Sequence, residues 1–136
     1  MSAGFNDWLA ITQLKAAYCR LLDIKDWEGW GQVWAEDAMQ DVTGSGGEIF
    51  HGRAAIVAAT RGSIETAKTA HQVHSPEIVV DGDTATGTWA MQDRVIWNET
   101  RALTGYGHYV ERYVKRGGRW QIAELKLTRL IMEFDK

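Results

Sequence analysis

His71 has the residue type and the position to act as an acid–base group. It stands at the start of an alternating, strand-like stretch, 70–80, and an imidazole titrates near neutral pH. To act as a base, the ring needs a partner that orients it. Asp23 lies near the end of the first expected helix and can reach His71 at a hydrogen-bond distance of roughly 2.6–3.2 Å, if that helix crosses the sheet. Tyr18, on the same helix, could then bind or protonate an oxygen atom of a substrate.

The spacing of Tyr18 and Asp23 sets a condition on this hypothesis. Five residues correspond to about 140° around an ideal helix. Both side chains therefore face one cavity only if the helix ends between them and the chain turns inward. Tyr18 could otherwise be a core residue, because it continues the helical spacing of Ile11 and Leu14.

A second carboxylate falls on an apolar strand face. Along 84–97 the odd-numbered residues, which include Trp89 and Met91, are apolar except for Asp93. A carboxylate in such surroundings needs a partner or takes up a proton. We expect Asp93, Trp89 and Met91 to contribute to a substrate-binding surface. The alternative is a structural ion pair between Asp93 and an arginine.

Arg129 lies on an apolar side of the last expected strand, together with Leu127 and Ile131. A guanidinium in that place must meet a carboxylate or an anionic ligand. Structural pairing with Asp93 or Asp23 is one outcome. The other is a cavity in which Arg129 is catalytic and Leu127 contacts the substrate.

No metal site is expected. His71 and His74 differ in parity, so on a regular strand they point to opposite faces, and His-x-x-His on a strand is a poor zinc signal. His108 is more readily explained as a packed or surface residue than as a third ligand. The sequence also offers no nucleotide-binding motif, so we expect no cofactor.

Composition limits the class of protein and its partners. The 136 residues are 45% apolar and 24% charged, which predicts one globular domain, 1–136. The net charge of −3 and the lack of a basic stripe exclude nucleic acid as an expected partner. Seven tryptophans suit a core or a cavity wall.

The expected location is the cytoplasm. Cys19 is the only cysteine, so no internal disulfide can form. The first residues show no signal peptide, and no apolar stretch is long enough to cross a membrane.

The periodicity predicts helices first and long strands last, which is the α+β pattern. Asn6 or Asp7 could cap the first helix, which should end near Asp23, and Asp26 could cap the second, on which Trp27, Trp30 and Trp34 would share a core-facing side. The third helix is expected at 54–67, and the strands at 38–43, 48–51, 71–80, 84–97, 103–115 and 119–134.

Two positions predict irregular strands. Pro76 lies inside the first long strand and cannot donate to a sheet, so it marks an edge or a bulge. In the last strand the apolar residues change from even to odd positions, which predicts a bulge near 123–124. The outer faces of the long strands carry apolar side chains, among them Ile96, Tyr106 and Val110 with Val114. We therefore expect a homodimer or homotrimer.

Several motifs resemble one known group of proteins across nearly the whole chain. They are Ile11-x-x-Leu14-x-x-x-Tyr18-x-x-x-x-Asp23, Asp26-x-x-x-Trp30, Phe50-x-Gly52-Arg53, His71-x-x-His74-Ser75-Pro76-Glu77-Ile78, Asp81-Gly82-Asp83-Thr84-Ala85, Gly107-x-Tyr109-x-x-Arg112-Tyr113 and Gly118-Arg119-Trp120-x-Ile122. The sequence is similar to the SnoaL-like, scytalone-dehydratase-like branch of the nuclear-transport-factor-two-like superfamily.

This resemblance implies a cone-shaped fold, a cystatin-like α+β barrel. In it a strongly bent antiparallel sheet wraps three helices around an apolar pocket. Related dehydratases and a dehydrochlorinase use a Tyr, an Asp and a His, which match Tyr18, Asp23 and His71. A bile-acid dehydratase adds a late arginine and a further acid, for which Arg129 and Asp93 are the candidates.

The implied function is that of a lyase without a cofactor, which eliminates water or another group from a small apolar ring-containing substrate. His71 would be the base, Asp23 would orient it, and Tyr18 and Arg129 would hold the developing negative charge. The scaffold hosts many reactions. An isomerase, a hydrolase or a non-catalytic ligand-binding or assembly module is therefore the alternative.

Overall fold

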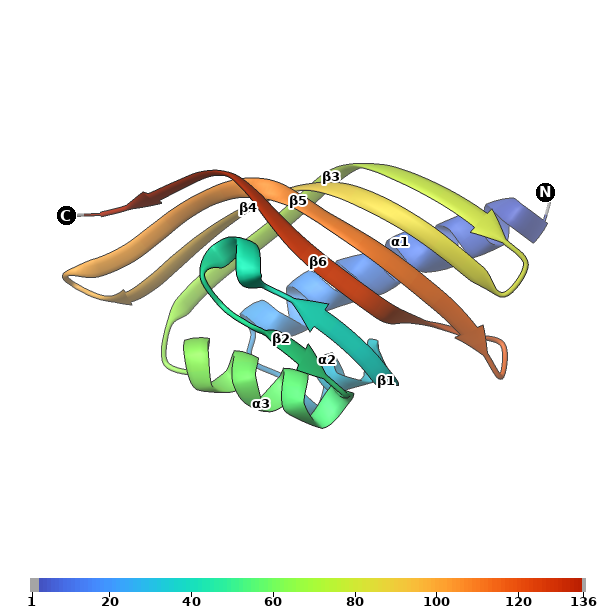
Figure 1. Cartoon of the computed structure of the whole chain (residues 1–136), viewed down its shortest axis with the longest axis horizontal. Helices are drawn as coiled ribbons and strands as arrows, with labels where there is room; N and C mark the ends of the chain where they lie inside the picture. Colours follow the sequence, from blue (N-terminus) through green and yellow to red (C-terminus); the bar gives the residue numbers. More distant parts are fainter. Residues whose placement is uncertain (1–2, 136) are drawn as a thin grey trace.

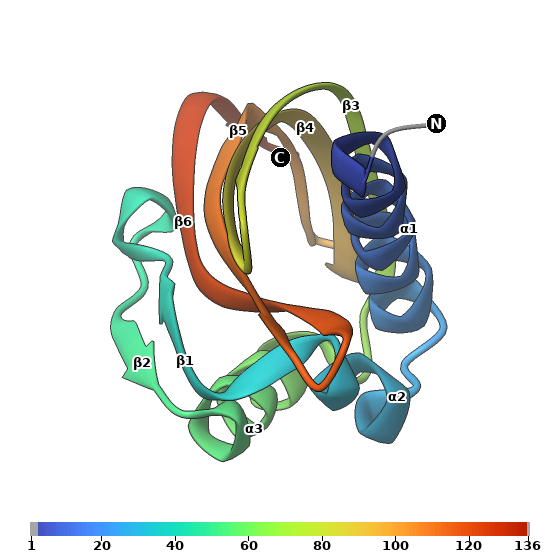
Figure 2. The same cartoon turned by 90° about the vertical axis from the view of Figure 1, so that its right-hand side faces the viewer.

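Six segments with strand-like alternation pair into one curled sheet, and three helices lie on its inner side (Figures 1 and 2). The computed structural model describes residues 3–135. The elements are α1 (Ala3–Asp23), α2 (Trp27–Gln32), β1 (Trp34–Asp41), a 3₁₀ turn (Thr43–Ser45), β2 (Ile49–His51), α3 (Arg53–Ile64), β3 (Lys68–Asp81), β4 (Thr84–Asn98), β5 (Arg101–Arg116) and β6 (Arg119–Phe134).

The α+β class and the strongly bent sheet are confirmed. The strand order is β2-β1-β6-β5-β4-β3, so β2 and β3 are the two edges and the sheet does not close into a barrel. One pairing differs from the expected antiparallel sheet, because β1 runs parallel to β6. These two strands lie far apart in the sequence, and no tight turn forces them to be antiparallel.

The N-terminal helix begins earlier than expected. It starts at Ala3, so neither Asn6 nor Asp7 is its cap. The Asp7 carboxylate instead accepts hydrogen bonds from Trp120 Nε1 at 2.9 Å and from Lys115 Nζ at 3.1 Å. These bonds lower the pKa of Asp7, and they tie the start of α1 to the far end of the sheet.

The expected cap of α2 is confirmed, but the helix is shorter than expected. Asp26 Oδ1 accepts from the backbone N–H of Gly29 at 2.9 Å. The helix ends at Gln32, so Trp34 begins β1 rather than extending the helical stripe. The core role of the stripe holds for Trp30 and Trp34, which are both fully buried, with ring centroids 5.6 Å apart.

Both predicted irregularities are present. The register of β3 against β4 shifts between His74 and Glu77, around Pro76, and β3 is an edge strand. The register of β6 against β5 shifts at residues 122–124. A second shift further along β6 was not expected. It leaves Leu130 as an extra residue, so Ile131 turns outward, 48% exposed, instead of sharing the inner side with Arg129.

A buried ion pair joins α1 to β5. Lys15 Nζ lies 2.6 Å from Glu111 Oε2, and neither side chain is exposed. The other Glu111 oxygen accepts from the Tyr113 hydroxyl at 2.5 Å, and the Tyr113 oxygen accepts from Trp89 Nε1 at 2.9 Å. Every charge in this network therefore has a partner, which burial requires. Burial lowers the pKa of Lys15, and Glu111 opposes this change.

No helix among residues 3–135 is both long and apolar enough to cross a membrane.

Replacing Lys15 by methionine should be strongly destabilising. The variant leaves Glu111 as a buried charge without its cation, and we expect the free energy of unfolding to fall by about 3–5 kcal/mol. K15M/E111Q should be more stable than K15M, because the glutamine oxygen still accepts from Tyr113 without a charge. Urea denaturation measures these differences, with the exposed Lys68→Met as the control. A K15M midpoint equal to that of the wild type would contradict this assignment.

The homodimer or homotrimer stays a prediction, and the outer sheet face is where it would form. Tyr106 and Val110 are 39% and 45% exposed there, while Ile96 and Val114 are half-buried. Burial of this face between copies should give a dimer or trimer in sedimentation equilibrium at micromolar concentration. Val110→Lys should shift the association toward monomer. A wild-type protein that sediments only as a monomer would contradict the prediction.

Candidate active site

A cavity of about 350 Å³ lies where α1 ends, between α3, the β1–β2 connection and the inner face of the sheet. Its volume is in the range of small-molecule sites. The wall is mostly apolar and is formed by residues such as Leu22, Val42, Phe50, Ile64, Val95, Leu103, Leu125, Leu127 and Met132. Tyr18, His71, Asp93 and Arg129 contribute the polar groups considered below.

The end of α1 fixes the position of Asp23. Asp23 is the last helical residue, and the N–H of Lys25 donates back to the Leu22 carbonyl at 3.1 Å. Lys25 has a left-handed backbone, with φ of 64°, at a position where glycine is usual. Its side chain compensates, because Nζ donates to Thr69 Oγ1 at 2.7 Å. The helix end is thereby attached to β3.

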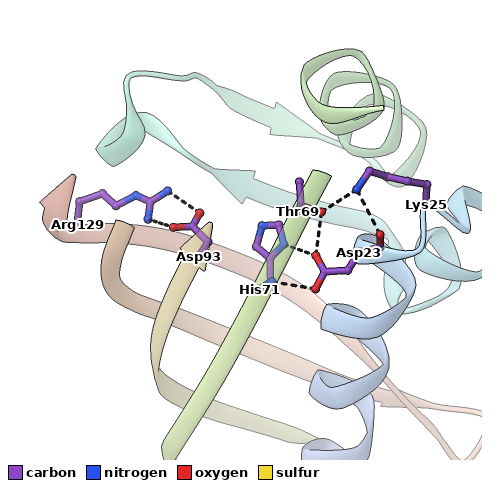
Figure 3. Close-up of polar contacts among 6 residues, drawn as sticks. All are labelled: Asp23, Lys25, Thr69, His71, Asp93 and Arg129. Atoms are coloured by element: carbon purple, nitrogen blue, oxygen red, sulfur yellow. Dashed lines mark hydrogen bonds and ion pairs between the residues drawn. The ribbon is translucent and has the colours of Figure 1, made fainter. Parts of the chain in front are cut away.

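The Asp23 carboxylate accepts three hydrogen bonds from β3 (Figure 3). The backbone N–H of His71 donates to Oδ2 at 2.8 Å, and His71 Nδ1 lies 2.7 Å from Oδ1. The Thr69 hydroxyl donates to Oδ1 at 2.9 Å. Because β3 is an edge strand, its outward N–H groups have no neighbouring strand to bind. Asp23 therefore satisfies the strand edge and orients the imidazole with the same group.

The helix does not have to end between Tyr18 and Asp23 for both residues to contribute to the site. The helix continues through both residues, but the sheet curls around it, so each faces a different strand. Asp23 reaches the edge strand β3, whereas the Tyr18 ring packs against Tyr109 of β5, with centroids 5.7 Å apart. Asp23 lies behind His71, while His71 and Tyr18 themselves line the cavity.

Tyr18 remains a phenol rather than a phenolate. It is 3% exposed, and burial with the nearby Glu111 raises the pKa of its hydroxyl well above the ordinary value. Lys15 Nζ lies 3.5 Å from the centroid of its ring and 3.8 Å from that of Tyr109. The charged core network thus supports the ring from behind, and the hydroxyl can act as a hydrogen-bond donor.

Asp93 and Arg129 pair with each other. The guanidinium donates from Nη1 and Nη2 to the two carboxylate oxygens at 2.8 and 3.0 Å, and from Nε to Ser45 Oγ at 2.8 Å. Asp93 is the register partner of His71, so the pair forms the polar wall on the other side of the imidazole from Asp23 (Figure 3). Three of the five N–H donors of Arg129 are used in these bonds.

Two residues expected to contact the substrate do not line the cavity. Trp89 lies further along β4, in the core, where its N–H binds Tyr113. Met91 lies behind the guanidinium, with its sulfur 3.7 Å from Arg129 Nη1. The alternation of odd and even positions indicated the correct face of β4, but the cavity lies only against the second half of this strand. Leu127 lies in the cavity wall as expected.

The histidines occupy the faces that their parity predicted. His74 is exposed, with Nδ1 3.1 Å from Ser75 Oγ, while His71 turns inward. Across the described part of the chain, no three His, Cys, Asp or Glu side chains are grouped so that they could hold a metal ion.

Gly105 is a site residue that sequence reasoning missed. A Cβ atom built on it would collide with Arg129 Nη1 and Asp93 Oδ1. Because Gly105 has no side chain, the Asp93–Arg129 pair can pack directly against the backbone of β5. Thr69 and Lys25 were missed as well, and no local pattern marks either of them.

Comparison with known proteins identifies the scaffold. A family model described as a SnoaL-like domain matches residues 5–126. A proposed aromatic ring hydroxylase from Novosphingobium aromaticivorans is 23% identical, with a TM-score of 0.91 over 98% of this chain and 96% of its own. A proposed scytalone dehydratase from the same organism is 20% identical, with a TM-score of 0.85 over 95% and 87%.

A third similar structure is the type 3 hexachlorocyclohexane dehydrochlorinase of Novosphingobium barchaimii. It is 15% identical, with a TM-score of 0.84 over 96% of this chain and 90% of its own. At these identities the three structures show a shared fold.

Gly105→Ala should force the Asp93–Arg129 pair apart. Because both charges are nearly buried, we expect the free energy of unfolding to fall by about 1–3 kcal/mol. Gly62→Ala is the matched control, since nothing lies within 4 Å of its Cβ position and it is in the helix α3. It should be neutral or gain about 0.5–1 kcal/mol. Equal chemical denaturation curves for G105A and the wild type would refute this role of Gly105.

Proposed function

Because the chain belongs to the SnoaL-like domain family, we propose that it is a cofactor-independent lyase of the dehydratase type, acting on a small apolar ring-containing molecule. One observation carries this proposal. The His71 ring faces a half-open, mostly apolar cavity, while its Nδ1 is held 2.7 Å from the Asp23 carboxylate. The names of two similar structures, a proposed dehydratase and a dehydrochlorinase, both denote eliminations and support it.

Asp23 determines which nitrogen of His71 can act. A carboxylate accepts hydrogen bonds, so in the neutral ring Nδ1 carries the proton and Nε2 keeps its lone pair. Nε2 can then take a proton from a carbon next to a carbonyl group of the bound substrate. The same carboxylate stabilises the imidazolium that forms, because opposite charges attract more strongly in an apolar site.

The elimination balances within this site. The C–H proton moves to Nε2, the C–H electron pair becomes the new C=C bond, and the C–O bond to the leaving hydroxyl breaks. The imidazolium returns its proton to the departing hydroxide, so water leaves and His71 is neutral again. The Tyr18 hydroxyl stabilises the negative charge on the substrate oxygen as a hydrogen-bond donor.

Arg129 and Asp93 have a more limited part in this mechanism. The carboxylate neutralises the guanidinium, and three of its N–H groups already donate to Asp93 and Ser45. The second N–H of Nη1 points to the Met91 sulfur, so the second N–H of Nη2 is the donor that can hold the oxygen of the leaving group. The substrate body lies against Leu127 and the other apolar walls, which favours a ring without charged substituents near the reacting carbon.

The first test uses 3-hydroxy-1-tetralone, which yields the fluorescent 1-naphthol when it loses water, within a panel of cyclic β-hydroxy ketones. We expect turnover of the panel by the wild type. His71→Ala should lower the rate by about 10²–10⁴, because an oriented base is removed. His74→Ala is the matched control on the same strand, and its exposed ring should leave the rate unchanged. Asp23→Asn should also lower the rate.

Three results would contradict the lyase proposal. They are no turnover of any panel member above the buffer rate, turnover that survives in H71A, and formation of a positional isomer without loss of water. If Asp23→Asn lowers only the melting temperature and leaves turnover intact, the hydrogen bond is structural.

A further inference from the structure

The cavity contains two guanidinium groups with different partners. Arg129 is neutralised by Asp93 at 2.8 Å. Arg101 also lines the cavity and is itself exposed to solvent, and among residues 3–135 no carboxylate pairs with it. Glu99, in the β4–β5 turn that precedes Arg101, is exposed and makes no ion pair with it. An unneutralised cation at the entrance to an apolar cavity is a binding group for an anion.

The Arg101 guanidinium stacks on the aromatic ring of Trp97, which holds it in place. Its guanidinium carbon lies 4.3 Å from the centroid of the Trp97 ring. The ring itself is fixed, because its Nε1–H donates to the Ser63 carbonyl of α3 at 2.9 Å. Stacking of this kind occupies the face of the guanidinium and leaves its N–H edges available. Those edges match a carboxylate bidentately.

Strand register gives the distance between this cation and the base. His71 pairs with Asp93, which pairs with Gly105, and Arg101 lies four residues from Gly105 along β5. At the rise of a β-strand Arg101 is about 13 Å from Gly105, and His71 is two strand spacings to the side, so the backbones of Arg101 and His71 are about 16 Å apart. Val95 and Leu103, which pair with each other between these two rows, line the cavity with apolar groups.

We propose that Arg101 is a specificity-determining residue that binds a carboxylate on the substrate, so that the substrate is an apolar ring acid whose anionic end lies at the cavity mouth. The placement of the reacting carbon at His71 rests on the proposed lyase function, whereas the binding of the carboxylate does not. Arg129 is unsuited to binding the substrate carboxylate, because Asp93 already accepts hydrogen bonds from both of its Nη atoms.

The test compares biphenyl-4-carboxylic acid with biphenyl-4-carboxamide, which differ only in the charged end, by isothermal titration calorimetry at low salt. The wild type should bind the acid at least about tenfold more tightly than the amide, as a charge-assisted bidentate contact allows. Arg101→Gln should reduce this preference to less than about twofold. Arg112→Gln, the same change on the outer side of the same strand, should keep the wild-type preference.

Three results would overturn the inference: no binding of the acid by the wild type, equal affinities of the wild type for both compounds, or a preference that survives in R101Q. His71→Ala separates this inference from the lyase proposal. It should keep the acid preference while losing turnover, so a failed lyase assay leaves the binding result interpretable.

Discussion

The free edge of β3 is the constraint on which the site depends. An edge strand presents N–H groups that no neighbouring strand satisfies, and here the Asp23 carboxylate satisfies one of them, the N–H of His71. The same carboxylate binds the imidazole and the Thr69 hydroxyl, which in turn accepts from Lys25 at the end of α1. The Asp23 carboxylate therefore holds together the end of α1, the edge of β3 and the candidate base His71. Movement of any of them would disturb the other two.

The long strands serve two purposes along their length. Toward the β3–β4 turn they cover a charged core, in which the Lys15–Glu111 pair is fully buried. Toward the β4–β5 turn they line the cavity. Tyr18 lies at the boundary, with the Lys15 ammonium behind its ring and its side chain in the cavity wall. The core network thus fixes the position of a residue that we place in the mechanism, and stability and function are coupled there.

Sequence reasoning worked where the information was local. Alternation gave the faces of His71 and Asp93, and Pro76 marked the irregular edge strand. The Asp23–His71 contact followed from element order together with the family resemblance. Sequence reasoning failed where distant segments meet. The parallel β1–β6 pairing and the Lys15–Glu111 pair, 96 residues apart, leave no local pattern.

Periodicity also predicts which face of a strand a residue is on, but not how far along the strand the cavity lies, so it places Trp89 in the cavity.

We infer that Asp23 holds His71 with Nδ1 protonated and Nε2 free toward the cavity. The most direct measurement is the ¹⁵N NMR spectrum of the histidine rings, at a pH where His71 is neutral. We expect His71 to be the Nδ1–H tautomer in the wild type and to lose this preference in D23N, while His74 is unchanged. A wild-type His71 with its proton on Nε2 would contradict it.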